Sequence, residues 1–440
     1  MELGASIFVR ANKNLWRATE EFNLTRTGFT GDDDGDETGI WDGEKFVFTM
    51  GASNGWLGGW WNSLKVVWRY GYRAPKNTQA IVDGMVSDFK TLYSPAYGAV
   101  PWKNVSEVSD RLGWPHFVSQ SVSEYLDLQG IDRRWTRELV EAATRVNYGQ
   151  DVDRIHALGG FVSLAATGAS SVEGGNFQIF EQFVKHSKAN VYFNTTVTSV
   201  KRDTSNLWTV ESTSSQTGTM RYRAVILAAP YHSTSISFPS SLATVPPPQP
   251  YVNLHVTLLA TTTASANPEY FGLSAEKAKT PRVILTTAEG RRNGGRKPEF
   301  NSLTFHGKVR RVDGAEGVEE NLVKVFSEER IGDEWLEKMF GEGKVTWVYR
   351  RLFEAYPVLP PTTAFPPIKL DEGLYYVNAF EPLISTMETE TIASRNVVSL
   401  LLDDLYNAAI CKPAAEDVES TMTTIKTSKP DEEFVYGWDC

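Results

Sequence analysis

The position with the clearest chemical meaning in this chain is a helix start near Thr386. A short strand from Gly373 to Phe380 turns at Glu381 to Ser385, and a helix with an apolar stripe follows. The amides at such a helix N-terminus can stabilise a developing anion. The sequence contains no Ser-His-Asp order, no cysteine-nucleophile motif and no Walker loop, and no carboxylate pair can be singled out. The helix start is therefore a candidate anion site, and the residues alone nominate no catalytic group.

Metal chemistry is not expected. The six histidines never fall at ligand spacing, and the two cysteines, Cys411 and Cys440, are too few for a metal site or a disulfide framework. The acidic run Asp32 to Asp36 could suggest calcium, but Gly43 stands near the place where the usual loop has a bidentate Glu. A solvated turn is the favoured interpretation of that run.

Composition describes a globular chain with an acidic balance. It has 440 residues, 41% of them hydrophobic and 22% charged, with a net charge of −10. No basic block offsets the acids, which argues against a nucleic-acid partner. No window approaches 18 continuous apolar residues, so no transmembrane helix is expected. Three N-x-S/T sequons, at Asn23, Asn104 and Asn194, permit a lumenal or secreted location, although the start Met1-Glu2-Leu3-Gly4 is not a signal peptide.

The stretch from Val172 to Pro230 predicts the centre of an α/β unit. Phenylalanines three apart after Asn176 predict a helix with one apolar face, and residues 191–200 alternate as a strand does. A polar hairpin follows, and the apolar run 224–229 predicts a parallel strand buried on both faces. An ordinary α/β core without a cofactor is the alternative interpretation.

The rest of the chain supplies the elements that would surround this unit. Helical spacing predicts helices at 121–130, 132–146 and 333–340, and residues 251–259 alternate as a strand does. The helical part either caps a ligand cavity or is a packing subdomain, and Trp56, Trp60 and Trp61 favour core packing over a ligand wall. We therefore predict an α/β (α+β) fold whose parts are an interrupted nucleotide-binding domain at 1–60, 160–240 and 370–410, a mainly helical insertion at 60–160, a mixed-sheet substrate domain at 240–370 and a tail at 411–440.

Several motifs together resemble the prenylcysteine oxidase (prenylcysteine lyase) family. They occur in the family's order and cover roughly residues 60–410: Arg145-Val-Asn-Tyr-Gly-Gln150, Ser170-Ser-Val-Glu-Gly-Gly-Asn176, Ala355-Tyr-Pro357, and Leu374-Tyr-Tyr-Val-Asn-Ala-Phe-Glu381 with Ser385-Thr-Met-Glu388. The two ends of the chain resemble flavin amine oxidases more distantly. The resemblance implies FAD bound on a discontinuous Rossmann-type domain. It also implies oxidative cleavage of the thioether of farnesyl- or geranylgeranylcysteine by oxygen, giving an isoprenoid aldehyde, cysteine and hydrogen peroxide, in a lysosome- or vacuole-like lumen or outside the cell.

The resemblance also implies cofactor-binding positions, although it nominates no catalytic residue. Gly174 and Gly175 would let backbone approach the flavin or the substrate, because glycine has no side chain. Val197 would face the adenine, and Ala229 would lie in the loop leaving the buried strand. The remaining positions would lie near the flavin ring or its pyrophosphate: Gly4, Ala5, Ser6, Asn378, Glu381, Ser385, Thr386 and Met387. Tight turns at the two glycines and ordinary strand burial of Val197 are the alternatives.

One departure from the family pattern concerns the pyrophosphate. The G-x-G-x-x-G that holds it after the first strand of a Rossmann domain is absent from this sequence. We therefore expect a shortened front and weak FAD binding, or none, by the 440 residues alone. Two other functions stay open: a flavin amine oxidase that acts on amines, and a flavin-free protein that binds an isoprenoid or a partner.

Overall fold

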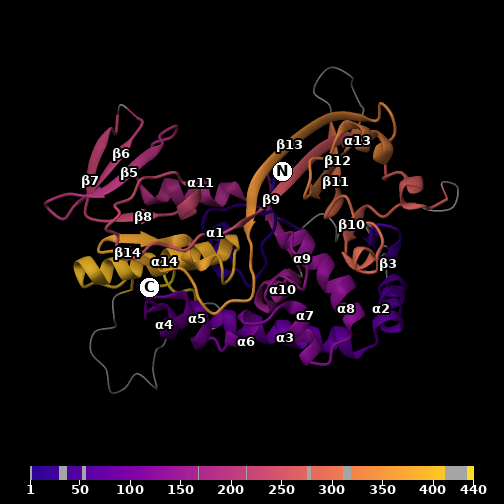
Figure 1. Ribbon diagram of the computed structural model, residues 1–440, viewed down its shortest axis with the longest axis horizontal. Coiled ribbons are helices and arrows are strands. Elements are labelled where there is room, and N and C mark those ends of the chain that lie inside the picture. Colours follow the sequence, from indigo (N-terminus) through magenta and orange to yellow (C-terminus); the bar gives the residue numbers. More distant parts are fainter. Residues whose placement is uncertain are drawn as a thin grey trace.

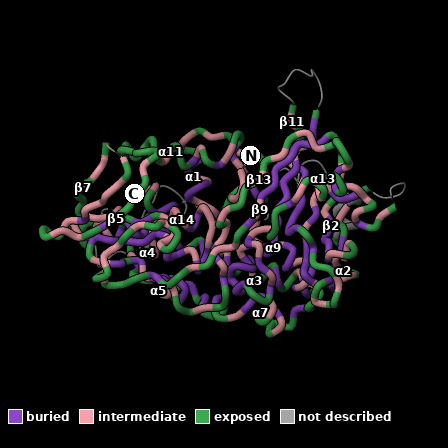
Figure 2. The backbone as a smooth tube through the Cα atoms, turned by 45° about the horizontal axis from the view of Figure 1, so that its top comes forward, coloured by how far each residue is buried: buried purple, intermediate pink, exposed green. Residues whose placement is uncertain are grey.

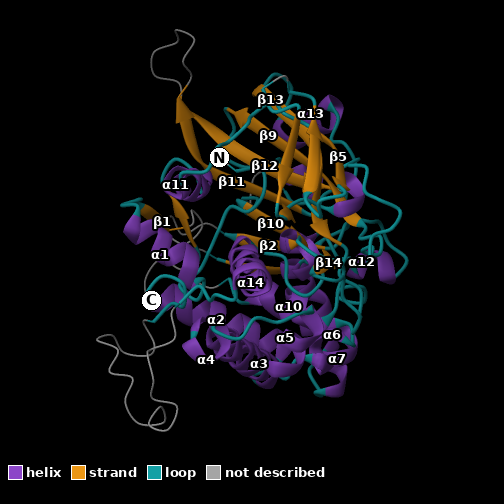
Figure 3. Cartoon of the chain, turned by 90° about the vertical axis from the view of Figure 1, so that its left-hand side faces the viewer, coloured by secondary structure: helices purple, strands orange, loops and turns teal. Residues whose placement is uncertain are grey.

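The computed structural model describes residues 2–28, 37–51, 56–166, 168–214, 216–274, 279–310, 319–411 and 434–440. Figure 3 shows the strands gathered in one layer and most helices in another, with α14 (Met387–Tyr406) between them. This mixed architecture confirms the α/β class expected from the sequence. The division into domains stays a prediction.

The largest sheet has seven strands in the order β13-β9-β12-β11-β10-β2-β3 (Figure 1). Its pairs are antiparallel except β10 with β2. The strand predicted at 251–259 is confirmed by β9: Leu254, Val256 and Leu258 lie in one core cluster, and Leu259, on the opposite face, lies in another. The strand bounds are β2 (Thr38–Trp41), β3 (Phe46–Met50), β9 (Tyr251–Thr261), β10 (Val283–Thr286), β11 (Ser302–Arg310), β12 (Glu319–Ser327) and β13 (Val345–Pro357).

A helical layer lies against this sheet and against α14 (Figure 1). Two of its helices begin at local caps: Asn104 accepts the amide of Glu107 before α5, and Ser121 forms a capping box with Glu124 before α7. The helix bounds are α2 (Trp56–Tyr70), α3 (Arg73–Lys90), α4 (Pro95–Gly98), α5 (Val105–Arg111), α6 (Pro115–Val118), α7 (Val122–Leu128), α8 (Arg133–Trp135), α9 (Glu141–Tyr148) and α10 (Ala157–Leu164). A π-helical turn, Thr136–Val140, joins α8 to α9.

Three small sheets and three helices make the part that holds most of the predicted cofactor positions. Strand β8 pairs in parallel with β15, which pairs with β14; β5, β6 and β7 form a meander; β1 pairs with β4. The bounds are β1 (Arg26–Gly28), β4 (Ser170–Val172), β5 (Val197–Arg202), β6 (Trp208–Ser212), β7 (Thr219–Tyr222), β8 (Val225–Leu227), β14 (Lys369–Asp371), β15 (Leu374–Tyr376), α1 (Lys13–Glu21) and α11 (Phe177–Ser187). Two short helices follow strands of the large sheet in the chain: α12 (Glu289–Arg292) after β10 and α13 (Asp333–Phe340) after β12. Helix α13 confirms the helix predicted at 333–340.

The stretch 172–230 differs from its prediction in three ways. The strand begins at Val197 rather than 191. Strand β8 is parallel as predicted but not buried on both faces, because it is the last strand of its sheet and Ile226 is 40% exposed. Helix α11 is mostly exposed or half-buried along its length (Figure 2). Phe177 and Phe180 are 51% and 37% exposed, and Ile179 is buried in a cluster with Phe8 and Leu15 instead. The predicted apolar face of this helix is therefore the wrong one.

The end of the chain is not a simple tail. Phe434, Val435 and Tyr436 are buried, the Tyr436 amide donates to the Tyr93 carbonyl, and Cys440 forms a disulfide with Cys411. Aromatic burial explains why these last residues pack, whereas the polar residues 412–433 lie outside the described part. The acidic run 32–36 and the side chains of Trp56, Trp60 and Trp61 also lie outside it.

Candidate functional site

The first predicted group, Gly4, Ala5 and Ser6, lies against the glycine pair. Phe8 and Ser170 exchange backbone hydrogen bonds of 2.9 and 2.8 Å, and the Asn176 amide nitrogen donates to the Ala5 carbonyl at 2.9 Å. The two glycines have positive φ of 86° and 129°, a region that favours glycine. A Cβ at Gly175 would lie 2.7 Å from the Phe177 ring. The structure therefore brings these positions together. Glycine is required at position 175 because its φ is positive and because a Cβ would collide with the Phe177 ring.

Lys324, which the sequence analysis did not single out, contacts the same segment. Its ammonium donates to the Ser6 hydroxyl at 3.0 Å and to the Glu2 carbonyl at 3.4 Å. The side chain is buried on β12, and this burial lowers the pKa of Lys324 to about 8. A single lysine within an alternating strand carries no signal in the sequence, because its partners lie more than 300 residues away.

The second predicted group surrounds the start of α14, and the predicted helix start at Thr386 is confirmed. The Thr386 hydroxyl accepts the Thr389 amide at 3.1 Å, and the Thr389 hydroxyl accepts the Thr386 amide at 2.9 Å. The amides of Met387 and Glu388 find no acceptor within the described residues. This leaves two N–H groups and the positive end of a 20-residue helix available to an anion.

Two carboxyl groups, Glu381 and Glu390, lie beside this helix end. Burial, followed by the charge of Glu381, raises the pKa of Glu390 to about 8. Burial also raises the pKa of Glu381, although hydrogen bonds from Tyr251 and Asn378 act in the opposite direction. This carboxylate pair was missed from the sequence because Glu381 lies in the turn and Glu390 in the helix.

Glu388 lies in the first turn of α14 but binds the start of another helix. Its carboxylate accepts the amides of Asn14 at 2.8 Å and Leu15 at 3.0 Å, at the start of α1. The Tyr93 hydroxyl donates to it at 2.5 Å. Burial nevertheless raises the pKa of Glu388 to about 7, so removal from water outweighs these favourable contacts.

Met387 connects the two groups, whereas Val197 and Ala229 pack on the core cluster that also contains Phe380 and Ile384 from the turn before α14. Met387 packs on the cluster that contains Phe8 and Val172. Val197 pairs with Ser212, and both Val197 and Ala229 pack on the large core of the helical layer.

The chemistry around α14 suits a ligand that carries both an anionic edge and hydroxyl donors. Two buried acceptor atoms, Asn378 Oδ1 and Glu390 Oε1, have no partner within the described residues. They would accept hydrogen bonds from a polyol, while the amides of Met387 and Glu388 would donate to a negative edge. Among the same residues, no cluster of histidine, cysteine or carboxylate side chains could hold a metal ion.

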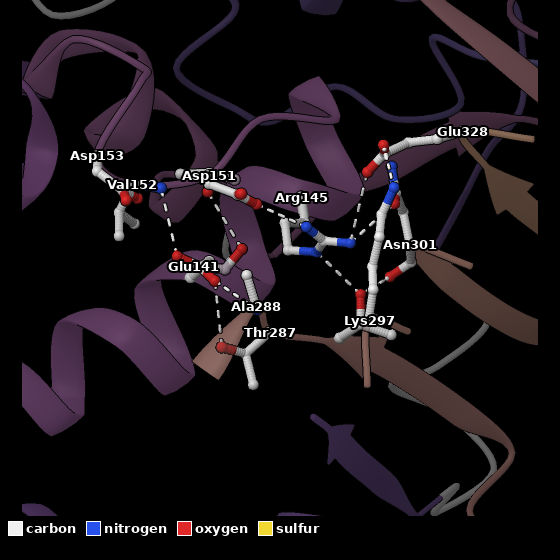
Figure 4. Close-up of polar contacts among 12 residues, drawn as sticks. Glu141, Arg145, Asp151, Val152, Asp153, Thr287, Ala288, Lys297, Asn301 and Glu328 are labelled. Atoms are coloured by element: carbon white, nitrogen blue, oxygen red, sulfur yellow. Dashed lines mark hydrogen bonds and ion pairs between the residues drawn. The ribbon is translucent and has the colours of Figure 1, made fainter. Parts of the chain in front are cut away.

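The Arg145 motif forms a structural network rather than a reactive site. The Arg145 guanidinium binds Asp151 at 2.5 Å, Thr286 at 3.0 Å and Asn301 at 3.0 Å (Figure 4). Glu141, one turn earlier, accepts the amide of Ala288 at 2.6 Å and is fully buried. Each charge here is paired within the protein, so the network joins α9 to the large sheet, although the buried Asn301 Nδ2 beside it has no partner within the described residues.

Comparisons with known proteins identify the relatives of this chain and its fold. The chain is 28% identical to farnesylcysteine lyase of Arabidopsis thaliana, over 91% of this chain and 77% of that protein, and 27% identical to prenylcysteine oxidase 1 of Mus musculus, over 91% and 78%. The solved structure of putrescine oxidase bound to putrescine superposes with a TM-score of 0.52 at 13% identity, over 91% of this chain and 88% of the other, which shows a shared fold. Within the described part, no helix has the length and apolar character needed to cross a membrane. The sequence profile of the prenylcysteine lyase family matches residues 56–411, and the chain therefore belongs to that family.

Proposed function

We propose that this chain is an FAD-dependent thioether oxidase that cleaves farnesyl- or geranylgeranylcysteine to an isoprenoid aldehyde, cysteine and hydrogen peroxide. Membership of the prenylcysteine lyase family and the names of its relatives support the reaction. The observation that carries the cofactor site is the open helix end at Met387 and Glu388, with Asn378 Oδ1 and Glu390 Oε1 buried beside it.

The reaction requires little acid–base catalysis from the protein. Hydride leaves the allylic carbon next to sulfur, and the resulting cation is stabilised by sulfur and the double bond. Water adds to that carbon and loses a proton, and the hemithioacetal collapses to the aldehyde and the thiol of cysteine. The chemistry that bound FAD would supply is acceptance of this hydride and reduction of oxygen to hydrogen peroxide.

The residues of this chain would bind and orient the reactants. The amides of Met387 and Glu388 would stabilise negative charge on the cofactor, and the acceptors on Asn378 and Glu390 would bind its hydroxyl groups. Backbone at Gly174 and Gly175 would lie against it, because both positions lack a side chain. The sequence has no G-x-G-x-x-G for the pyrophosphate, so we expect weak binding of FAD by these 440 residues.

Flavin content and product analysis test the proposal. The purified chain is titrated with FAD, and the loaded protein is given farnesylcysteine, with hydrogen peroxide and farnesal measured. A polyamine or monoamine substrate is the matched control. Peroxide from the amine alone would instead support an amine oxidase, the function named in the solved structures of similar fold. Absence of flavin binding at saturating FAD would favour a flavin-free binding protein.

A lumenal or secreted location is the second part of the proposal. The three sequon asparagines, Asn23, Asn104 and Asn194, are all exposed, so their side chains are accessible to glycosylation. Expression through a secretory pathway followed by removal of N-glycans should increase the electrophoretic mobility of the chain. An unchanged mobility would contradict glycosylation at these sites.

A further inference from the structure

The turn before α14 is held by two side chains of the helical layer. His156 binds the carbonyl of Pro382 at 3.1 Å, and the Tyr148 hydroxyl donates to the carbonyl of Ser385 at 3.1 Å. We infer that Tyr148 and His156 are positioning residues, which fix the turn 382–385 and thereby the open amides of Met387 and Glu388. The effect expected on FAD rests on the proposed function, whereas the effect on the turn itself does not.

The hydrogen bonds of His156 determine which ring nitrogen carries its proton. The Gly159 amide donates to Nδ1 at 3.0 Å, so Nδ1 is an acceptor. Burial lowers the pKa of His156 to about 4, so the ring is neutral at pH 7 and its proton is on Nε2. Nε2 therefore donates to the Pro382 carbonyl. One neutral imidazole thus caps α10 with one nitrogen and holds the turn with the other.

Tyr148 holds the other end of the same turn from α9. Its ring is buried and packs edge-on against Tyr356, with 5.7 Å between the ring centroids. Gly149 ends α9 with a φ of 65°, and Gln150 then binds the connector through the Pro357 carbonyl at 3.1 Å and the Leu359 amide at 2.9 Å. Both the ring and the backbone of Tyr148 are therefore fixed independently of α14.

The support for these two side chains is rigid. Arg145, one turn before Tyr148, is bound to the large sheet through Thr286 and Asn301 (Figure 4). The His156 amide donates to the Leu359 carbonyl at 2.8 Å, so α10 shares the connector that Gln150 binds. A shift of the turn relative to the helical layer would break hydrogen bonds on both sides of it.

Three carbonyl groups of the turn are satisfied, whereas the amides of Met387 and Glu388 have no acceptor within the described residues. The Ile384 carbonyl, between the two held carbonyls, accepts from the Thr389 hydroxyl at 3.0 Å. With three acceptors of the turn satisfied, its position relative to α14 is determined. A displacement of about 1 Å is enough to weaken a geometry-dependent contact strongly. The helical insertion thus positions the cofactor-facing end of α14, beyond packing against it.

Substitutions at His156 separate its two contacts. Asn places an acceptor near the position of Nδ1, so His156→Asn retains the cap of α10 and removes the bond to Pro382. Gln reaches further, and its amide nitrogen replaces the Nε2 donor, so His156→Gln is the rescue variant. Tyr148→Phe removes only the hydroxyl. Tyr125→Phe is the matched control, because the Tyr125 ring is buried in the same layer and its hydroxyl has no partner among the described residues.

Hydrogen exchange of the peptide 380–391 tests the positioning without any cofactor, and FAD affinity and the flavin absorption spectrum test its consequence. We expect faster exchange in His156→Asn and Tyr148→Phe, and FAD binding weaker by about fivefold for each lost hydrogen bond. His156→Gln and Tyr125→Phe should behave as the native chain does. Native exchange in His156→Asn and Tyr148→Phe would overturn the inference. Absence of FAD binding by the native chain would contradict the proposed function alone, because the exchange experiment would still decide the inference.

Discussion

Glu390 is buried close enough to Glu381 for the charge of one to oppose ionisation of the other. Burial is the larger cause, and together they raise the pKa of Glu390 to about 8 from an ordinary value of 4.5. Two carboxyl groups beside a helix end that is open to anions cannot both be ionised without cost. The natural consequence is that Glu390 holds its proton near neutral pH and can donate or accept a hydrogen bond there.

As the pH rises, the Glu390→Gln variant should become more stable relative to the native chain. The folded state holds the Glu390 proton up to about pH 8, whereas the unfolded state releases it near pH 4.5. The contribution of Glu390 to the free energy of unfolding of the native chain is therefore fully present below pH 4.5 and is lost as the pH rises to 8. Between pH 5 and 8 we expect the free energy of unfolding of the variant to gain about 3 kcal/mol on that of the native chain.

Urea unfolding at several pH values measures this difference. Glu337→Gln, which makes the same change on the exposed face of α13, is the matched control. A constant difference between Glu390→Gln and the native chain across this range would contradict the shared burial of the two carboxyl groups.

Removal of the Glu388 carboxylate should destabilise the chain strongly. Glu388→Ala leaves the buried amides of Asn14 and Leu15 without an acceptor, and it leaves the Tyr93 hydroxyl only its longer hydrogen bond, to the Ala11 carbonyl at 3.3 Å. We expect a loss of about 3–5 kcal/mol in the free energy of unfolding, and a loss of only about 1 kcal/mol for Tyr93→Phe. Denaturant unfolding of both single variants and of the double variant measures their coupling. Losses that simply add would contradict the hydrogen bond between them.

Local patterns in the sequence predicted the elements but not the side chains that complete the site. The helix from Thr386 and strand β9 follow from capping residues and alternation, which are short-range signals. Lys324, Tyr148 and His156 reach the site through contacts between residues hundreds of positions apart, for which no local pattern exists. The face of α11 was predicted wrongly because periodicity identifies apolar positions but does not determine which of them meet a neighbour.

Arg145→Met should cost more stability than the loss of an exposed ion pair. The Arg145 guanidinium is 4% exposed and binds Asp151, Thr286 and Asn301, so its removal leaves buried acceptors without donors. We expect a loss of about 3–5 kcal/mol in the free energy of unfolding. Arg133→Met, which removes an exposed pair with Asp127, is the control and should leave the free energy of unfolding nearly unchanged. Equal losses in the two variants would show that the network does not join α9 to the large sheet.

Gly175→Ala should damage the site through sterics as well as through backbone strain. Its φ of 129° is unfavourable for alanine, and the new Cβ would lie 2.7 Å from the Phe177 ring and 2.9 Å from the Glu2 carboxylate. Gly168→Ala is the matched control, because Gly168 also has a positive φ, of 68°, but nothing lies within 4 Å of its added Cβ. We expect a loss of about 1–2 kcal/mol in the control from strain alone, and about 2 kcal/mol more in Gly175→Ala, measured by denaturant unfolding. FAD affinity should fall in Gly175→Ala and stay native in the control, since only Gly175 adjoins the segment from Gly4 to Ser6. Equal stability in the two variants would mean that Phe177 and Glu2 move aside, and native FAD affinity in Gly175→Ala would then remove the glycine pair from the cofactor site.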